Sequence, residues 1–275
     1  MIFTKMHGLG NDFLVFGDGG ENRDWRELAK ELCRRRLSVG ADGILVVLPS
    51  ESADIRMRIF NADGSEAEMC GNGIRCFAKY VYERGIVAKQ QMTVETLAGI
   101  MVPRLKLEGG KVTQVTVDMG RPEFERARIP MTGEGRAFDV PITAAGQPVT
   151  VSALLMGVPH AVVLTQDIDS LDTAALGPAI ETHPLFPKKT NVNFVQVLDR
   201  DNIRVLTWER GAGLTLACGT GSCASVAALH QKGLIGRSAD VHLAAGKLSI
   251  ECLEDGRVMM TGPAEDVYTA ALTGL

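Results

Sequence analysis

Two short runs that join a cysteine to glycines are the part of this sequence best suited to chemistry. They are Cys70-Gly71-Asn72-Gly73 and Cys218-Gly219-Thr220-Gly221, and each precedes a segment with helical character. A thiolate is a good base, and the partial positive charge at a helix N-terminus favours the thiolate form. Two such groups, one on each side of a carbon, could remove a proton and return one from the opposite side. The pattern therefore predicts inversion of a stereocentre.

The glycines beside each cysteine suit the binding of an anion. They allow a tight turn and leave backbone N–H groups open at the start of a helix. An amino-acid carboxylate is such an anion, and it gains negative charge when its α-proton is removed. The same N–H groups would then bind the transition state better than the ground state. Turnover in either direction needs one thiolate and one thiol, so we expect the pair to share a single proton.

The two runs belong to a longer internal repeat with a fixed offset of 148 residues. At that offset Arg84-Gly85-Ile86 falls on Lys232-Gly233-Leu234, and residues 58–61 fall on residues 206–209. A period this long indicates a duplicated domain, whereas solenoids repeat over shorter spans. Each half therefore reads as strand, helix and strand, with its cysteine at the junction between a strand and a helix.

Length and composition fit a protein of two domains. At 275 residues the chain exceeds a typical single core, and 45% of its residues are hydrophobic. Many short strands and few helices predict an α+β fold with two pseudo-symmetric domains, in which a curled mixed or antiparallel sheet surrounds a central helix. We expect an N-terminal domain at residues 1–119, joined by the C-terminal strand 265–275, and a C-terminal domain at residues 120–264. The Gly-Arg-Pro run at 120–122 marks the boundary.

Charge and cysteine usage exclude several classes of protein. The net charge of −4 argues against a nucleic-acid or membrane-surface partner, and no apolar stretch approaches the roughly 20 residues of a membrane span. Residues 1–6 lack a signal-peptide pattern, so we expect a cytoplasmic protein with reduced thiols. No C-x-x-C or H-x-x-x-H spacing occurs, so we expect no metal site. We assign packing roles to the other four cysteines, which are Cys33, Cys76, Cys223 and Cys252.

Five ordered motifs in this chain resemble those of the diaminopimelate epimerase family. The motifs are Met6-His7-Gly8-Leu9-Gly10-Asn11-Asp12-Phe13, Phe60-Asn61-Ala62-Asp63-Gly64-Ser65, Met69-Cys70-Gly71-Asn72-Gly73-Ile74-Arg75-Cys76, Trp208-Glu209-Arg210-Gly211-Ala212-Gly213 and Ala217-Cys218-Gly219-Thr220-Gly221. The resemblance extends from the first expected strand to Thr261-Gly262-Pro263-Ala264. It implies a cofactor-independent epimerase that interconverts LL- and meso-2,6-diaminopimelate in lysine and peptidoglycan synthesis. It also implies two pseudo-symmetric domains with the site in the cleft between them.

The resemblance implies roles for the matching residues around the reacting carbon. Cys70 and Cys218 would be the two bases. The reacting carboxylate would be held by the backbone amides of Gly71, Asn72, Gly219 and Thr220. Asn11 and Glu209 would lie near the reacting amino group, and His160 together with Glu209 would tune the thiol pKa values.

At the distal end of the substrate the resemblance implies a role for Arg210. Its planar guanidinium suits bidentate recognition of a carboxylate, and Asn61 and Asn191 would help it. Two positions depart from the family pattern: Val158 stands where many members have asparagine, and Gly43 where some have glutamine. Loss of a polar contact to a buried charged group can cost about 1–3 kcal/mol. The sequence therefore indicates the reaction type more firmly than the substrate.

Each polar candidate also has a structural explanation. Asn11 could close a turn, and Asn61 and Asn191 could cap the ends of strands. Glu209 and Arg210 could be a solvated pair at a strand end, and His160 could be a hydrogen-bonded core histidine. The resemblance, and for the Glu209-Arg210 pair the repeat, favour the functional explanation.

The sequence also predicts the partners of the protein and leaves two other functions open. Tyr268 matches a family position of dimer contact, so we expect a homodimer that acts on a small amino-acid substrate without a cofactor. The second hypothesis is a racemase of the same architecture for another amino acid, such as a proline-type or histidine-type substrate. Val158, which departs from the family pattern, would reflect this different substrate, but related proline racemases usually have histidine in place of Asn72. The third is a thiol-dependent hydrolase or redox protein that uses one cysteine with His160, which leaves the second Cys-Gly-x-Gly run unexplained.

Overall fold

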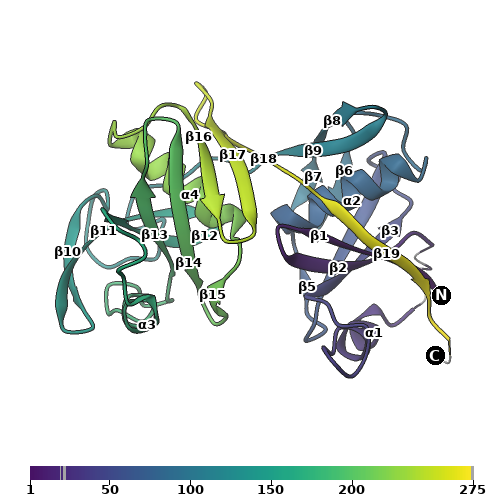
Figure 1. Ribbon diagram of the computed structural model, residues 1–275, viewed down its shortest axis with the longest axis horizontal. Helices are drawn as coiled ribbons and strands as arrows, with labels where there is room; N and C mark the ends of the chain where they lie inside the picture. Colours follow the sequence, from purple (N-terminus) through teal and green to yellow (C-terminus); the bar gives the residue numbers. More distant parts are fainter. Residues whose placement is uncertain (19, 21–22, 274–275) are drawn as a thin grey trace. The chain divides into compact units, whose positions relative to one another are not determined.

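The computed structural model describes residues 1–18, 20 and 23–273, and its chain divides into two compact units (Figure 1). The first unit comprises Met1–Asp118 together with Thr261–Leu275, and the second comprises Met119–Met260. The sequence interpretation drew these limits after residue 119 and before residue 265. None of the described helices is both long and apolar enough to cross a membrane.

The first unit is built on a mixed sheet. Its elements are β1 (Ile2–Gly8), β2 (Asn11–Phe16), α1 (Trp25–Leu32), β3 (Gly43–Leu48), β4 (Ile55–Asn61), β5 (Glu66–Ala67), α2 (Gly71–Glu83), β6 (Val94–Thr96), β7 (Gly99–Met101), β8 (Arg104–Glu108), β9 (Lys111–Asp118) and β19 (Glu265–Ala271). The strands of the sheet run in the order β19-β1-β2-β3-β4-β6-β7, and β5 pairs with β4. The β2–β3 and β4–β6 pairs are parallel, whereas β8 and β9 form an antiparallel pair.

The second unit repeats this plan. Its elements are β10 (Val140–Ala144), β11 (Gln147–Met156), β12 (Val158–Thr165), α3 (Thr173–Glu181), β13 (Asn191–Val197), β14 (Asn202–Glu209), β15 (Gly213–Thr215), α4 (Gly219–Gln231), β16 (Ser238–Leu243), β17 (Gly246–Cys252) and β18 (Val258–Gly262). The strand order is β10-β11-β12-β13-β14-β16-β17-β18, with β15 paired to β14. The parallel pairs are β12–β13 and β14–β16, which correspond to β2–β3 and β4–β6. The duplication predicted from sequence is therefore also a duplication of topology.

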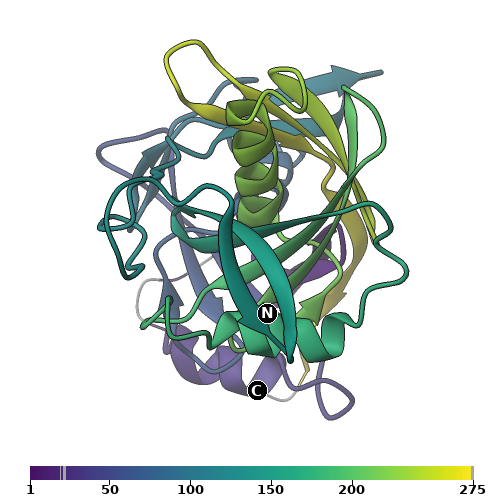
Figure 2. The ribbon, with the colours of Figure 1, turned by 90° about the vertical axis from the view of Figure 1, so that its left-hand side faces the viewer.

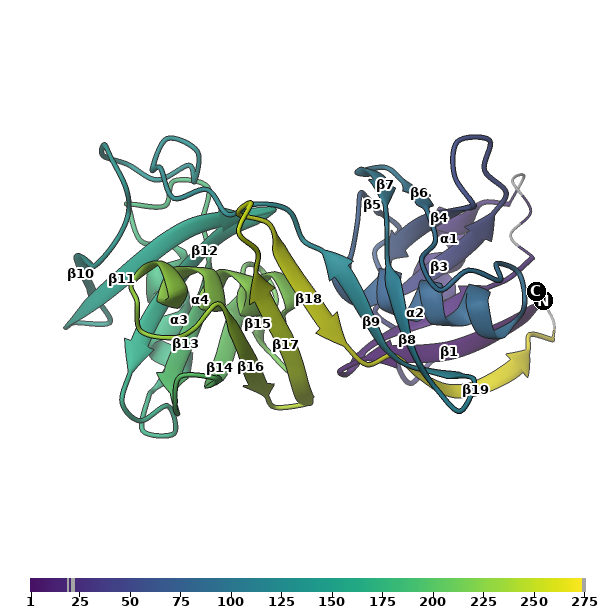
Figure 3. The same cartoon turned by 90° about the horizontal axis from the view of Figure 1, so that it is seen from above.

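Each sheet carries a long central helix on one face and a shorter helix on the other. In the first unit α2 packs against β1, β2, β3, β4 and β9, as Figure 3 shows for the blue helix. In the second unit α4 packs against β11, β12, β13, β14, β16 and β17, and Figure 2 shows it within the curve of these strands. On the opposite faces, α1 buries Trp25 and Leu32, and α3 buries Leu176 and Ile180. This arrangement confirms the predicted α+β fold class.

Local sequence explains the limits of three elements. Helix α1 ends at Leu32, because the chain then turns sharply and Arg36 has a left-handed φ of 68°. Strands β7 and β8 are separate, with Pro103 between them. Helix α3 was not predicted at all, since it contains Gly177 and Pro178, which disfavour a helix. The glycine is required by packing, because a Cβ there would lie 2.5 Å from Trp208 Cδ2.

Candidate active site

Cys70 and Cys218 occupy equivalent positions, each as the residue that immediately precedes a central helix. Both have extended backbones, with φ of −141° at Cys70 and −124° at Cys218. The helices that follow are both 13 residues long. Each helix is followed by a glycine in the left-handed region, with φ of 69° at Gly85 and 71° at Gly233. Each sulfur therefore lies at the positive end of a helix dipole, as the repeat predicts.

In the first unit the structure brings together Cys70, Asn11 and Asn72. The Cys70 Sγ accepts a hydrogen bond from the backbone N–H of Gly73 at 3.4 Å and lies 3.7 Å from Asn11 Oδ1, to which the thiol donates. Asn72 Nδ2 donates to the same oxygen at 3.1 Å. The Oδ1 atom of Asn72 is buried and has no hydrogen-bond partner among the described residues. These three side chains form one polar cluster at the start of α2.

A network of charges fixes the orientation of Asn11. Asp42 Oδ2 accepts hydrogen bonds from Asn11 Nδ2 at 2.8 Å and from the backbone N–H of Asp12 at 3.0 Å. Arg35 pairs with Asp12 at 2.6 Å and with Asp42 at 2.7 Å. Burial raises the pKa of Asp12, but hydrogen bonds from Arg35 and Lys5 outweigh it and hold that pKa below its ordinary value. Because the Asn11 amide nitrogen faces Asp42, its oxygen faces the Cys70 thiol.

Asn61 and Arg75 are the other polar residues of this region in the first unit. Asn61 ends β4, is exposed, and donates from Nδ2 to Ser65 Oγ at 2.9 Å. Arg75 is fully buried, and its guanidinium donates to the carbonyls of Pro263 at 3.1 Å and Gly71 at 3.3 Å. The sequence interpretation missed this role of Arg75, although the residue lies inside a quoted motif. A buried arginine under the first turn of α2 anchors the C-terminal segment to that turn.

In the second unit Cys218 lies beside Thr220 and Glu209. Its Sγ is 3.5 Å from Thr220 Oγ1, and the residue is only 5% exposed. Burial raises the pKa of the Cys218 thiol to about 12, and the negative charge of Glu209 adds to this effect. Smaller lowering effects of Thr220 and of the Gly221 N–H do not offset it. Cys218 is therefore a thiol at neutral pH, opposite to what a helix N-terminus alone predicts.

The turn between β14 and β15 carries Glu209 and Arg210. The Glu209 carboxylate accepts a hydrogen bond from Thr215 Oγ1 at 2.7 Å. The backbone N–H of Arg210 donates to Asn191 Oδ1 at 2.7 Å, and its guanidinium donates to the carbonyl of Lys188 at 3.0 Å. Glu209 at the end of β14, Arg210 after it and Asn191 at the start of β13 were predicted at opposite ends of the substrate, and they lie close together in one unit.

His160 lies in a fully buried polar network at the same end of the second unit. Thr207 Oγ1 donates to Asn193 Oδ1 at 3.1 Å, so the Asn193 amide nitrogen must face the other way. That nitrogen donates to the carbonyl of Ala161 at 3.3 Å and to His160 Nδ1 at 3.2 Å. Burial, with a smaller effect of Arg210, lowers the pKa of His160 to about 3. The imidazole is therefore neutral, with its proton on Nε2.

This assignment predicts the behaviour of His160 in solution. We expect its side chain to stay neutral in the Nε2–H form from about pH 5 to about pH 8, because burial excludes the imidazolium. Two-dimensional ¹H–¹⁵N spectra that connect ring carbons to ring nitrogens identify the tautomer, and comparison with a His160→Gln variant assigns the signals. A titration midpoint for His160 within that range would contradict the assignment.

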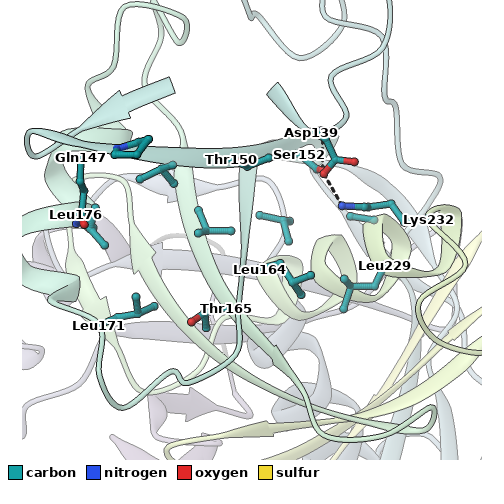
Figure 4. Close-up of a pocket in the computed structure, with 15 residues that line it drawn as sticks. Asp139, Gln147, Thr150, Ser152, Leu164, Thr165, Leu171, Leu176, Leu229 and Lys232 are labelled. Carbon is teal, nitrogen blue, oxygen red and sulfur yellow. Dashed lines mark hydrogen bonds and ion pairs between the residues drawn. The ribbon is translucent and has the colours of Figure 1, made fainter. Parts of the chain in front are cut away.

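A separate pocket of about 430 Å³ lies at the opposite end of α4 from Cys218 (Figure 4). It opens where β11 and β12 diverge, since their pairing ends at Ser152 and Val162. Leu229 lines one side, and Lys232 Nζ pairs with Asp139 Oδ1 at 2.5 Å on its rim. None of the predicted site residues lines this pocket. Within residues 1–18, 20 and 23–273, no cluster of three or more His, Cys, Asp or Glu could hold a metal ion.

The remaining predicted positions are Tyr268, Gly43 and Val158. Tyr268 is 44% exposed on β19, and its ring lies 6.0 Å from that of Phe3. A Cβ at Gly43 would lie 2.6 Å from the carbonyl oxygen of Phe60, so this backbone has no room for a side chain there. Val158 begins β12 and is half-buried.

Comparison with known proteins identifies the family. A sequence model described as diaminopimelate epimerase matches residues 3–125 and 152–267. A diaminopimelate epimerase of Pelotomaculum thermopropionicum is 52% identical over 273 residues, and one of Moorella thermoacetica is 53% identical over 272 residues. Both alignments cover 98% of this chain and 98% of the relative.

Solved structures share the fold at much lower identity. A phenazine biosynthesis protein of Bacillus anthracis matches with a TM-score of 0.73 and 18% identity, over 99% of both chains. An identity this low supports the fold alone. The family model and the full-length relatives go further, and by them this chain belongs to the diaminopimelate epimerase family.

Proposed function

We propose that this protein interconverts LL- and meso-2,6-diaminopimelate, with Cys70 and Cys218 as two bases on opposite faces of one Cα. The observation that carries the proposal is the duplication of a central helix with a cysteine at its N-cap position, one in each unit. Family membership supports the reaction and the substrate. The proposal includes that the two units bring their helix N-termini to one substrate.

The reaction balances with these groups alone. A thiolate removes the Cα proton, and the electron pair of that C–H bond moves into the carboxylate as an enolate. The backbone N–H groups of Gly71, Asn72, Gly219 and Thr220 would hold this carboxylate and stabilise its added charge. The opposing thiol then donates its proton to the other face of Cα and becomes the thiolate. The enzyme is then set for the reverse reaction, and exchange of the thiol protons with water restores the state for another forward turnover, so no cofactor is required.

The protonation state of Cys218 suggests which cysteine acts as the acid and which as the base. Because burial and Glu209 keep Cys218 protonated, it would act as the proton donor in the resting enzyme, and Cys70 would be the base once it has lost the proton that it donates to Asn11 Oδ1. If the substrate ammonium group binds near Glu209 and Asn11, its positive charge would offset that of the Glu209 carboxylate. Binding of substrate would thereby ease ionisation of Cys218 when the reaction runs in the other direction.

The distal carboxylate would bind to Arg210, with Asn61 and Asn191 beside it. In this structure the Arg210 guanidinium contacts only one carbonyl among the described residues, that of Lys188, so further N–H groups remain for a carboxylate. We also propose that the enzyme is a homodimer with Tyr268 at the contact. Its strand, β19, is an edge of the sheet, and edge strands can pair with another chain.

Chiral separation of the products tests this function. The purified protein is incubated with LL-diaminopimelate, and in parallel with L-proline, trans-4-hydroxy-L-proline and L-histidine. We expect conversion of LL-diaminopimelate to the meso form, equally before and after dialysis against a chelator. No conversion of diaminopimelate, but racemisation of another amino acid, would replace this proposal with the second hypothesis.

A further inference from the structure

Glu181, at the C-terminal end of α3, carries a nearly buried carboxylate that none of the steps above uses. The residue is 6% exposed. Its Oε2 accepts a hydrogen bond from Trp208 Nε1 at 2.8 Å, and its Oε1 pairs with Lys189 Nζ at 3.4 Å. Burial raises the pKa of Glu181, but these hydrogen bonds outweigh it and keep that pKa below its ordinary value. The side chain is therefore an anion with several donors around it.

The donors to Glu181 come from the two segments that hold the candidate substrate residues, the chain that enters β13 and the end of β14. Lys189 lies two residues before Asn191, and Trp208 lies immediately before Glu209. The backbone N–H of Gly211, just after Arg210, makes a smaller contribution to the lowered pKa of this carboxylate. One buried anion thus contacts both segments.

Further hydrogen bonds and packing contacts connect α3 to these two segments. The Glu181 carbonyl accepts a hydrogen bond from the N–H of Thr190 at 3.2 Å. Arg210 also forms two hydrogen bonds to the chain that enters β13. Its backbone N–H donates to Asn191 Oδ1, and its guanidinium donates to the carbonyl of Lys188. Packing restrains Trp208 as well, because it lies against Gly177 of α3, where no side chain fits. The position of the Arg210 turn therefore depends on α3.

We infer that Glu181 is a positioning residue that holds the Arg210 turn against the Asn191 loop, and so sets the affinity for the distal carboxylate of the substrate. This inference rests on the proposed function, in which Arg210 binds that carboxylate. The distal carboxylate does not change during the reaction, so its binding contributes equally to the ground and transition states. Loss of the anchor should then raise KM and leave kcat nearly unchanged.

Kinetics of two Glu181 variants and one control test the inference. We expect Glu181→Ala to raise KM for LL-diaminopimelate about tenfold or more, the scale of a lost charged hydrogen bond, with kcat within about threefold of wild type. Glu181→Gln keeps an acceptor for Trp208 and should raise KM less. The control is Glu83→Ala, which removes another partly buried carboxylate that accepts from Lys79 Nζ at 2.8 Å and the Val112 N–H at 2.9 Å. Its KM should match wild type.

A double-mutant cycle separates positioning from a general loss of structure. In an Arg210→Ala background, Glu181→Ala should change KM by less than about twofold, because the group through which it acts is absent. Equal effects of Glu181→Ala in both backgrounds, an unchanged KM in the single variant, or a rise in KM matched by Glu83→Ala would overturn the inference. Should wild type and Glu83→Ala both fail to epimerise diaminopimelate, the proposed function is what fails.

Discussion

Replacement of Cys218 by alanine is expected to lower kcat for epimerisation of LL-diaminopimelate by at least about a thousandfold. A methyl group can neither give nor accept a proton, and a well-placed general acid or base contributes about 10²–10⁴-fold. Cys70→Ala should have an effect of the same size, because each direction of the reaction uses both thiols in turn. Initial rates from chiral chromatography measure the loss.

The matched control for this prediction is Cys252→Ala. Cys252 is a thiol of the same unit, lies on β17, and has no role in the proposed reaction. Burial raises its pKa to about 11, so it too is protonated at neutral pH. We expect this variant to keep wild-type kcat. A Cys218→Ala enzyme with more than about a tenth of wild-type activity would show that Cys218 is not an obligatory acid or base.

Gly221→Ala is expected to destabilise the folded protein by about 3 kcal/mol, at the upper end of the cost of overpacking a core. The added Cβ would lie 2.3 Å from Asn193 Oδ1 and 3.1 Å from Thr207 Oγ1, and both atoms are held in the buried network of His160. These atoms cannot move away without breaking hydrogen bonds that have no access to water. Because Gly221 lies in the first turn of α4, the variant should also lose activity.

Chemical denaturation followed by circular dichroism measures this loss, and Gly236→Ala provides the control. At Gly236 the nearest atoms to an added Cβ lie 3.7 to 3.8 Å away, and its φ is not in the left-handed region. That variant should change the free energy of unfolding by less than about 1 kcal/mol. Equal stability of Gly221→Ala and wild type would mean that the His160 network is not packed as described.

The architecture of the chain was predictable where local sequence determines it. The glycines around Cys70 and Cys218 predict a helix N-terminus at each cysteine, and both central helices begin at the next residue. The spacing between the two runs predicts the duplicated topology, which the matching parallel pairs β2–β3 and β12–β13 and antiparallel pairs β3–β4 and β13–β14 confirm. Helix α3 was missed because its sequence opposes helix formation, and tertiary packing of Gly177 on Trp208 overrides that preference.

The supporting residues of the site could not be predicted, because distant parts of the chain create them. Arg75 contacts the carbonyl of Pro263, which lies 188 residues later. Asp42 orients Asn11 from the bend just before β3, and Glu181 contacts Trp208 of β14 and Lys189 before β13, which no local pattern connects to it. The pKa of Cys218 was expected to fall because of the helix dipole, but burial and Glu209 raise it. Local sequence reports the dipole, and only the folded structure reports burial.

Deuterium incorporation tests the two-base claim most directly. The enzyme is placed in D₂O with LL-diaminopimelate, and the α-positions of substrate and product are followed by NMR during early turnover. Two bases on opposite faces predict that product carries solvent deuterium at the inverted carbon while unreacted substrate keeps its protium. Deuterium that enters substrate and product at equal rates would show that one mobile base serves both faces, and would contradict the assignment of Cys70 and Cys218 as a pair.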